Sequence, residues 1–510
     1  MVFEFLHKIK TTTLKQTKNT NKPKNQEKIK LLVHLEKSVR SELFETVFKI
    51  INTANWFLKA YMLIVVILSS GLASYTVVQS FVDYFSYGVI TTSRTIFETP
   101  ILFPQVTVCN INPYTTQYAY DFLKDIDTAG NFFKNDSNMT YGESEDFLSN
   151  FYYQSLNIAT NENYTDQHRQ SLAHRFDDVL LGCYFNAEIC TANDFVWKFD
   201  PIYGNCYVFN SGFDAAGQPM DLKRSTAAGS YYGLSLTIYT DFVEKLSKFN
   251  SYIGGRGLII QIGNSSYKTE YGANGILVPA GFQTNLILDR SFKFSLPSPY
   301  SDCEIDNDSP KNQGSEIYRL IAQSTHQYTQ QLCFAECYQK WLISACNCSD
   351  SFFSVYNSTV CMTVEETLCL DNFFYGTYLS SNFIEQNCMP LCPLECNLTE
   401  YKTSPSSIPL LGDLYYEYIR ENKNLTADFV TRPLNKDTAT ESISVVNIFY
   451  YSLSYHLSVE TPKLDIIGLL ASIGGNLGLF LGVSLLSICE LVEILFQIYF
   501  IKKGKKVSSH

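Results

Sequence analysis

Two windows without a charged side chain, residues 60–82 and 466–489, constrain this 510-residue chain more than any other feature. At 1.5 Å per residue, each window can cross the roughly 30 Å hydrocarbon core of a bilayer as a helix. The first window follows a long polar segment and has no small-residue cleavage site, so we do not expect a cleaved signal peptide. The sequence therefore predicts two transmembrane helices.

The charge distribution predicts how the chain is oriented. Lys49 and Lys59 precede the first window, and four lysines at 502–506 follow the second. The positive-inside rule then places both termini in the cytosol. The predicted order is a cytosolic segment (1–59), the first span (60–82), an extracellular domain (83–465), the second span (466–489) and a cytosolic tail (490–510). The Asn-x-Ser/Thr glycosylation sequons agree, because all nine lie in the extracellular segment: Asn135, Asn138, Asn163, Asn264, Asn307, Asn347, Asn357, Asn397 and Asn424.

The net charge and the absence of catalytic motifs exclude two classes of protein. The formal charge is −11, and because residues 1–59 and 501–510 together carry +11, the remainder carries −22. Such an acidic chain argues against nucleic-acid binding. The sequence contains no HExxH, GxSxG or P-loop motif, so we expect no enzyme, and the short cluster GGRG at 254–257 predicts only a turn.

Fourteen of the fifteen cysteines lie between Cys109 and Cys396. Extracellular placement and an even count favour seven disulfides over the alternative, a metal cluster, and we expect neither a metal nor a cofactor. Cys333 and Cys337 are four residues apart, as are Cys388 and Cys392, a spacing that allows each pair to occupy one face of a helix. Two such helices running antiparallel would be joined by nested bridges, Cys333 with Cys392 and Cys337 with Cys388.

The rest of the extracellular segment is predicted to be mainly β-strand with a helical insertion, so the fold class is an α+β membrane protein. Runs rich in β-branched and aromatic residues occupy 207–210, 234–239, 257–262 and 286–296. From Phe449 to Glu460 the chain alternates, which predicts a strand with Phe449, Tyr451, Leu453, Tyr455, Leu457 and Val459 on one face. Only residues 461–465 separate this strand from the second span. We therefore expect a movement of the strand to be passed directly to the span.

Five motifs follow one another along the chain: FPQVTVCN (103–110), GNCYVFN (204–210), GFQT (281–284), ECNLTEY (395–401) and GGNLGLFLGVS (474–484). In this order they resemble the degenerin/epithelial sodium channel family, which includes acid-sensing and peptide-gated channels. The resemblance covers about residues 60–495. It implies a plasma-membrane trimer, homomeric or with related subunits, in which palm β-sheet, finger, thumb and knuckle regions adjoin a sodium-selective, amiloride-sensitive pore. It also implies the pairings Cys109–Cys206, Cys183–Cys190, Cys303–Cys396, Cys333–Cys392, Cys337–Cys388, Cys346–Cys369 and Cys348–Cys361.

The second span is the expected pore. Its glycines at 474, 475, 478 and 482 suggest local unwinding, although a GxxxG pair for close helix packing fits the same spacing. By resemblance, Gly482, Val483 and Ser484 form the selectivity tract for permeant Na⁺. The resemblance further implies inner carboxylate rings at Glu490 and Glu493, a gate at Ala471, Ser472 and Gly475, and a wrist contact between Tyr84 and Tyr300. The alternatives are interfacial capping for the glutamates, membrane-edge anchoring for the tyrosines, and a lipid-facing or first-span-facing Ala471.

The gating stimulus is predicted by elimination. The family's usual His-Gly pair before the first span is missing at 41–44. Acid-sensing members typically have His-Val-Thr after the first span, where this chain reads YGVIT at 87–91, and often an Asp at the position of Ser472. The extracellular histidines are scattered and are expected to be ordinary polar residues: His168, His174, His326 and His456.

The missing proton features favour an extracellular neuropeptide as the ligand. The alternatives within the family are a proton-gated and a constitutively active channel. An ATP-opened trimer would need a clustered basic phosphate pocket, whereas the lysines and arginines of the extracellular segment are dispersed. A nonconducting adhesion or accessory protein is a further alternative, for which a glycine-rich second span would have no particular use.

Overall fold

The computed structural model describes two compact units, a terminal unit within Met1–Ile90 and Thr461–His510 and a central unit within Thr91–Glu460. The described residues are 50, 53–130, 151–152, 154–161, 164–214, 216–242, 244–247, 249–252, 254–264, 275–305, 315–324, 328–350, 356, 358–380, 382–410, 412–421, 435–482, 492 and 496.

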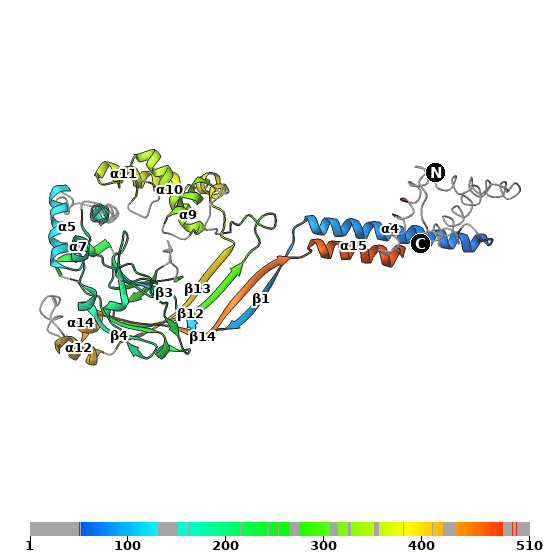
Figure 1. Ribbon diagram of the computed structural model, residues 1–510. Coiled ribbons are helices and arrows are strands. Elements are labelled where there is room, and N and C mark those ends of the chain that lie inside the picture. The colour runs from blue at the N-terminus through cyan, green and yellow to red at the C-terminus, as the bar shows by residue number, and fades with distance from the viewer. Residues whose placement is uncertain are drawn as a thin grey trace. The chain divides into compact units, whose positions relative to one another are not determined.

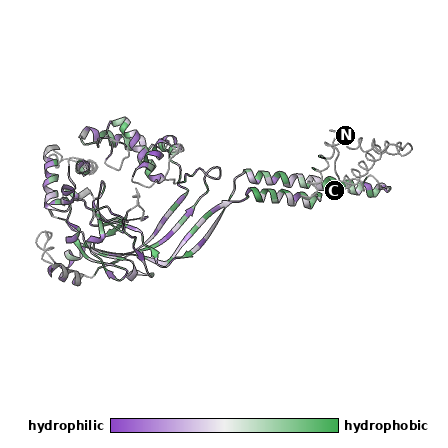
Figure 2. Cartoon of the chain, viewed as in Figure 1, coloured by the Kyte–Doolittle hydropathy of each residue, from purple (hydrophilic) through white to green (hydrophobic). Residues whose placement is uncertain are grey.

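Two apolar helices, α4 (Trp56–Phe85) and α15 (Ile466–Leu481), form most of the described terminal unit. Figure 2 shows that both are mainly hydrophobic. The 30-residue α4 extends beyond the predicted 60–82 at both ends, and within the described residues it alone is long and apolar enough to cross a membrane. The 16-residue α15 spans about 24 Å at 1.5 Å per residue, and residues 483–489 of the predicted second span lie outside the described residues.

The two helices lie side by side (Figure 1), and polar contacts join them at one point within α15 and at one point before it. The hydroxyl groups of Ser80 and Ser472 are 2.9 Å apart, so they form a hydrogen bond between α4 and α15. Before α15 begins, the Lys463 N–H donates to the carbonyl of Gly88 at 2.8 Å, and its ammonium lies 3.8 Å from Asp83. These contacts fix which face of α15 meets α4.

The central unit is built on two sheets and a short strand pair. The larger sheet has the order β13 (Asn397–Pro409), β12 (Phe282–Phe294), β14 (Ile443–Pro462), β9 (Leu234–Tyr239), β4 (Leu180–Phe185) and β5 (Glu188–Ile189), and β1 (Val89–Phe97) also pairs with β14. The smaller sheet has the order β11 (Ile276–Pro279), β10 (Gly257–Gly263), β3 (Gln105–Asn110), β7 (Gly204–Phe209) and β6 (Phe195–Asp200). The short pair is β2 (Ile101–Leu102) with β8 (Arg224–Ser225). The runs at 234–239, 257–262 and 286–296 are confirmed as strand over all or nearly all of their length.

One continuous core joins the two sheets. Val108 and Ile260 of the smaller sheet and Leu236, Leu286 and Ile448 of the larger sheet are all buried in the same cluster. Their burial is nearly complete, with at most 2% of each side chain exposed. The β-branched and aromatic runs of the sequence therefore form strands because their side chains fill this shared interior.

Strand β14 differs from its prediction. It begins at Ile443 rather than Phe449, and its first six residues are buried. Tyr451, which the alternation placed on the apolar face, is 81% exposed, whereas its neighbour Tyr450 is 1% exposed. The cause is a register shift against β12, because Leu288 pairs with Tyr450 but Arg290 pairs with Tyr455. Extra residues bulge out of β14 here, so the prediction of one continuous apolar face is wrong.

The helices of the central unit lie outside the sheets (Figure 1) and bury two further apolar clusters. They are α5 (Gln117–Gly130), α7 (Asp166–Ser171), α8 (Phe176–Val179), α9 (Glu316–Gln323), α10 (Gln330–Cys346), α11 (Val364–Phe373), α12 (Gly412–Glu421) and α14 (Lys436–Glu441). The central unit also contains short turns of other helix types: η1 (Ala192–Asp194), η2 (Ser230–Tyr232), η3 (Glu244–Leu246), η4 (Phe249–Tyr252), η5 (Phe374–Tyr378), η6 (Ile384–Cys388) and η7 (Met389–Leu391).

All seven expected disulfides are present. Cys333 and Cys337 lie on α10, as the spacing predicts. The prediction of a second regular helix for Cys388 and Cys392 is wrong. Cys388 ends the π-helical turn η6, and Cys392 follows the 3-10 turn η7, which contains Pro390. Proline cannot donate the hydrogen bond that an α-helix needs at that point, yet the short turns still direct both cysteines towards α10.

A buried arginine ties the larger sheet to the segment after β1. Arg290 on β12 is 2% exposed, and its guanidinium forms an ion pair with Glu98. Arg224 pairs with the other carboxylate oxygen of Glu98 at 3.0 Å. The Arg290 guanidinium also lies 4.9 Å and 5.0 Å from the ring centres of Phe292 and Tyr455. A buried charge persists only when it is paired in this way.

Candidate pore segment and extracellular pocket

Helix α15 has one face that packs against α4 and one that α4 leaves uncovered. Leu469 is buried and Ser472 half-buried on the packed face. Ala471, Gly475 and Gly478 are exposed, and their spacing of four and three residues places them on a single stripe. A side-chain carbon added at Gly475 would meet no atom within 4 Å. Small residues on an uncovered face allow another helix to approach closely.

The same stripe leads to the residue at which α15 ends. Gly482 has φ +68° and ψ +19°, the left-handed conformation that glycine adopts without steric cost. Its N–H donates to the carbonyl groups of Gly478 and Leu477, which closes the helix. A helix end of this kind leaves carbonyl groups without helical partners and concentrates the negative end of the helix dipole. Helix α15 therefore ends at Gly482, the first residue of the predicted selectivity tract.

The three predicted gate residues do not share one environment. Ala471 and Gly475 lie on the uncovered stripe. Ser472 is turned about 100° from Ala471 around the helix axis, and its hydroxyl bonds Ser80 of α4. Ala471 and Gly475 are therefore available to a neighbouring helix, whereas Ser472 fixes the contact within the chain.

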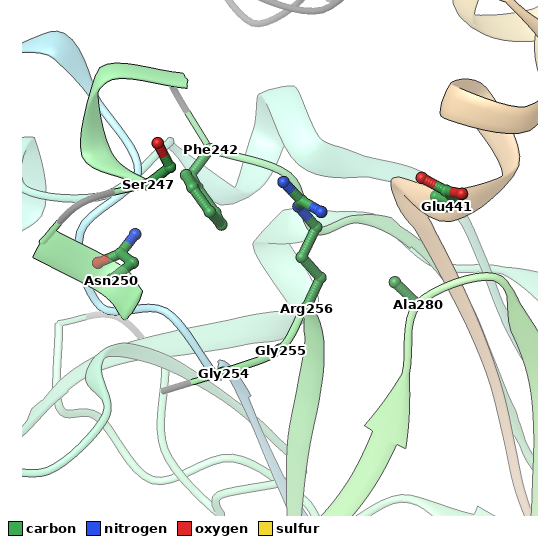
Figure 3. A pocket seen from close by; sticks show the side chains of 8 residues that line it. All are labelled: Phe242, Ser247, Asn250, Gly254, Gly255, Arg256, Ala280 and Glu441. Atoms are coloured by element: carbon green, nitrogen blue, oxygen red, sulfur yellow. The ribbon is translucent and has the colours of Figure 1, made fainter. Parts of the chain in front are cut away.

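Sequence reasoning missed a pocket in the central unit. The first three residues of the GGRG cluster, which was predicted to be only a turn, line a pocket of about 370 Å³ together with Phe242, Ser247, Asn250, Ala280 and Glu441 (Figure 3). Gly257 begins strand β10 at a position that requires glycine, because its φ is +148° and a side-chain carbon there would lie 2.2 Å from the Val278 carbonyl oxygen. The arginine inside the glycine cluster could have indicated this pocket, because a tight turn can hold a charged side chain so that it faces a cavity.

Two of the extracellular histidines are surrounded in ways that disfavour their protonated form. Burial lowers the pKa of His174 to about 3, although Asp241 acts in the opposite direction. Burial and the adjacent Arg169 lower the pKa of His168, which accepts or donates a 2.6 Å hydrogen bond with Tyr118. His456 is half-exposed, 3.6 Å from Asp289. His326 lies outside the described residues.

Comparison with known proteins decides the family. The family described as "Amiloride-sensitive sodium channel" matches residues 46–494, most of the chain. The chain belongs to the amiloride-sensitive sodium channel family. Its curated relatives include the epithelial sodium channel subunit gamma of Xenopus laevis, 24% identical over 64% of this chain and 46% of the relative. They also include the acid-sensing ion channel 1C of Danio rerio, 25% identical over 84% of this chain and 77% of the relative. The alignments therefore span about half of the epithelial sodium channel subunits and about three quarters of the acid-sensing channel.

The amiloride-sensitive sodium channel family consists of ion channels and not enzymes, as the sequence predicts. The family match runs from before α4 to beyond Gly482, so it includes the whole predicted selectivity tract and the inner glutamates. Val483, Ser484, Glu490 and Glu493 themselves lie outside the described residues. Their roles stay predictions.

The remaining predicted sites are distributed over both units of this family member. Tyr84 packs edge-on against Phe85 in the terminal unit, and Tyr300 donates its N–H to the Pro297 carbonyl in the central unit, so the wrist contact between them stays a prediction. Asn347 and Asn397 are exposed and Asn264 is half-buried. The other sequons lie outside the described residues: Asn135, Asn138, Asn163, Asn307, Asn357 and Asn424.

Proposed function

We propose that the chain is a subunit of a ligand-gated, sodium-selective, amiloride-sensitive channel in the plasma membrane. The subunits assemble as a trimer, either homomeric or with related subunits, with both termini in the cytosol. Each chain contributes α4 and the segment that begins with α15 to the bilayer. One observation supports the pore assignment most strongly. Helix α15 ends at Gly482, directly after the stripe of small residues Ala471, Gly475 and Gly478 that α4 leaves uncovered.

In the proposed pore, the uncovered stripes of three α15 helices face one another around an axis. Ala471 and Gly475 form the narrow closed contact, and the chain unwinds at Gly482. Carbonyl groups at the helix ends and the Ser484 hydroxyl replace part of the hydration shell of Na⁺. Glu490 and Glu493 form carboxylate rings on the cytosolic side, which attract cations and repel anions.

The proposed ligand is a short extracellular peptide. Burial lowers the pKa of His174 to about 3, so this histidine stays neutral in mildly acidic conditions. Burial and the adjacent Arg169 also lower the pKa of His168, which disfavours its protonated form. This supports a peptide as the activating ligand, because it argues against protons as the stimulus.

The permeation assignment is tested by substituting the filter. Gly482→Ala forces a side chain into the left-handed conformation at a cost of about 1–2 kcal/mol, and Ser484→Ala removes a hydroxyl ligand. Both variants are expected to change the Na⁺/K⁺ permeability ratio at normal surface expression. Gly71→Ala, at an open position on α4, is the matched control and is expected to leave the ratio unchanged. Reversal potentials that are unaltered in both filter variants would contradict the assignment.

A second candidate function is proton gating. It is favoured by relatives named acid-sensing ion channels, one of which, from Gallus gallus, is 24% identical over 84% of this chain. Current evoked by acid steps on cells that express the chain alone would support it, and current evoked only by peptides would support the first proposal. A nonconducting accessory role would give no current to either stimulus, including after substitution of Ala471.

A further inference from the structure

Three polar side chains from neighbouring strands of the larger sheet lie close together. They are His456 of β14, Asp289 of β12 and Thr95 of β1, and β14 pairs with both of the other strands. The Thr95 hydroxyl is 3.2 Å from Nδ1 of His456, and a carboxylate oxygen of Asp289 is 3.6 Å from Nε2. One nitrogen of the imidazole is therefore held by a hydroxyl, and the other faces a carboxylate.

The bulge in β14 gives rise to this arrangement. Because the register shifts between Leu288 and Arg290, no residue of β14 pairs with Asp289. His456 pairs with Ser291, two residues further along β12, so Asp289 reaches the imidazole diagonally. Bulges redirect side chains and are frequent next to functional sites. The interrupted ladder thus places a carboxylate beside a histidine that regular pairing would not bring opposite to it.

The gap between the two side chains has the size of a metal site. A separation of 3.6 Å is too long for a hydrogen bond, whose N···O distance is about 2.7–3.2 Å. Zn²⁺ binds imidazole nitrogen and carboxylate oxygen at about 2.0–2.2 Å, and a tetrahedral angle between two such bonds separates the ligand atoms by about 3.4 Å. A metal ion of this size fits between Nε2 of His456 and the Asp289 carboxylate with little movement of either strand.

Thr95 favours the form of the histidine that a metal ion needs. A metal ion at Nε2 binds the lone pair of that nitrogen, so Nδ1 must carry the proton. The Nδ1–H group can then donate to the Thr95 hydroxyl, which lies within hydrogen-bond distance. Histidines that bind metals almost always donate their second N–H group to such a partner, and this fixes the orientation of the ring.

The surroundings leave the gap accessible to an ion from solution. The side chains of His456 and Asp289 are 50% and 53% exposed, so water can complete the coordination. Lys402, which pairs with Asp289 across β13, has its ammonium 3.8 Å from Glu400 and forms its ion pair there. Structural zinc sites have four protein ligands. Two protein ligands and open positions instead indicate an ion that binds reversibly.

We propose that His456 and Asp289 bind a divalent transition-metal ion, with Zn²⁺ as the best fit, and that Thr95 orients the imidazole. The imidazole ligand favours such ions over Ca²⁺ and Mg²⁺, which take oxygen ligands. The bound ion joins β12 to β14 where the ladder is interrupted, on the strand that leads to α15. This site goes beyond the proposed function and does not depend on which ligand opens the channel.

The experiment uses the purified full-length channel in detergent micelles, with Zn²⁺ or Cu²⁺ alone as the probe. Zn²⁺ binding is measured by isothermal titration calorimetry, and Cu²⁺ by electron paramagnetic resonance, with Zn²⁺ as the competitor. Each variant is compared with the unmodified chain, because other histidines of the chain also bind these ions. We expect the unmodified chain to bind an additional Zn²⁺ compared with His456→Gln, and to show a nitrogen-ligated Cu²⁺ signal that this variant lacks.

Further variants test the geometry of the site. Asp289→Asn is expected to abolish the additional Zn²⁺ binding, and Asp289→His to strengthen it, because imidazole is a good ligand for these ions. Thr95→Val should weaken binding about tenfold, the scale of a lost contact that orients a ligand, whereas Thr95→Ser keeps the hydroxyl and should bind normally. The matched controls are Glu188→Gln and Glu188→His, which change an exposed carboxylate on β5 of the same sheet and should leave the site unaffected.

Each result supports or overturns a defined part of the proposal. Equal Zn²⁺ binding by the unmodified chain and His456→Gln would overturn the site and leave only an ion pair between His456 and Asp289. Loss of binding in His456→Gln, with no change in either Asp289 variant, would overturn the bridge between β12 and β14. Equal weakening by Thr95→Val and Thr95→Ser would overturn the orienting role of the hydroxyl. Loss of binding in Glu188→Gln would show that the effect is not specific to this site.

Discussion

Replacing Ala471 with Phe is expected to open the channel without ligand. Ala471 is exposed within its own chain and lies on a different face of α15 from Ser472, which bonds α4. Gly475, one turn further along, has no atom within 4 Å of an added side-chain carbon. A phenyl ring at 471 therefore fits in a single chain. Any strain that it creates must arise from the neighbouring chains around the proposed pore.

The size of the effect follows from that geometry. Overpacking a close contact costs about 1–3 kcal/mol. In the closed state each Ala471 would meet its counterparts across the axis, whereas in a splayed open state the ring would have room. A difference of about 1–3 kcal/mol between the two states shifts the opening equilibrium by about 5- to 150-fold for each chain that contributes.

The assay is amiloride-sensitive current in the absence of ligand, compared between Ala471→Phe and the unmodified chain. Leu470→Phe is the matched control, because Leu470 is 65% exposed and lies next to Ala471 but about 100° around the helix. We expect standing current from the first variant and none from the second. Normal surface expression without standing current in Ala471→Phe, or equal currents in both variants, would refute the placement of the closed gate.

Three further predictions concern the contacts that support the channel. Loss of the Cys333–Cys392 bridge in the Cys333→Ser/Cys392→Ser variant should lower the free energy of unfolding by about 2–4 kcal/mol. The variant should still assemble, as native gels would show, but should give weaker ligand-evoked current. Full activation by ligand would contradict this prediction. Burial lowers the pKa of His174 in the folded protein to about 3, whereas its pKa in the unfolded chain is about 6.5. The folded protein therefore loses stability as pH falls below about 6.5, because the unfolded chain then binds a proton that the folded protein does not bind. His174→Gln should therefore remove about 2 kcal/mol of the destabilisation between pH 6.5 and 5, measured by thermal unfolding, and an identical pH dependence in both proteins would count against it. Ser80→Ala and Ser472→Ala should show a coupling of about 0.6–1.7 kcal/mol in a double-mutant cycle of unfolding, whereas additive effects would disprove the hydrogen bond between α4 and α15.

Local patterns in the sequence predicted much of the architecture. The charge-free window at 60–82 predicted α4 because a continuous apolar run of that length has few other uses. Runs of β-branched and aromatic residues predicted β9, β10 and β12. The four-residue spacing of Cys333 and Cys337 predicted a helix, and family resemblance implied all seven disulfide pairings. Each of these signals is local, or is shared with a whole family.

The tertiary structure decided what depends on contacts between distant residues. The sequence shows that Ala471 and Ser472 are both small, but the position of α4 determines that Ser472 meets Ser80 while Ala471 stays uncovered. The bulge that exposes Tyr451 and buries Tyr450 arises from pairing with β12, which alternation along one strand cannot reveal. The sequence around Arg256 predicts only a turn. The pocket that Arg256 lines appears only in the fold, because Asp241, Phe242 and Glu441 come from other segments of the chain. Periodicity along the chain records which faces are apolar, and only the packed fold shows what each face meets.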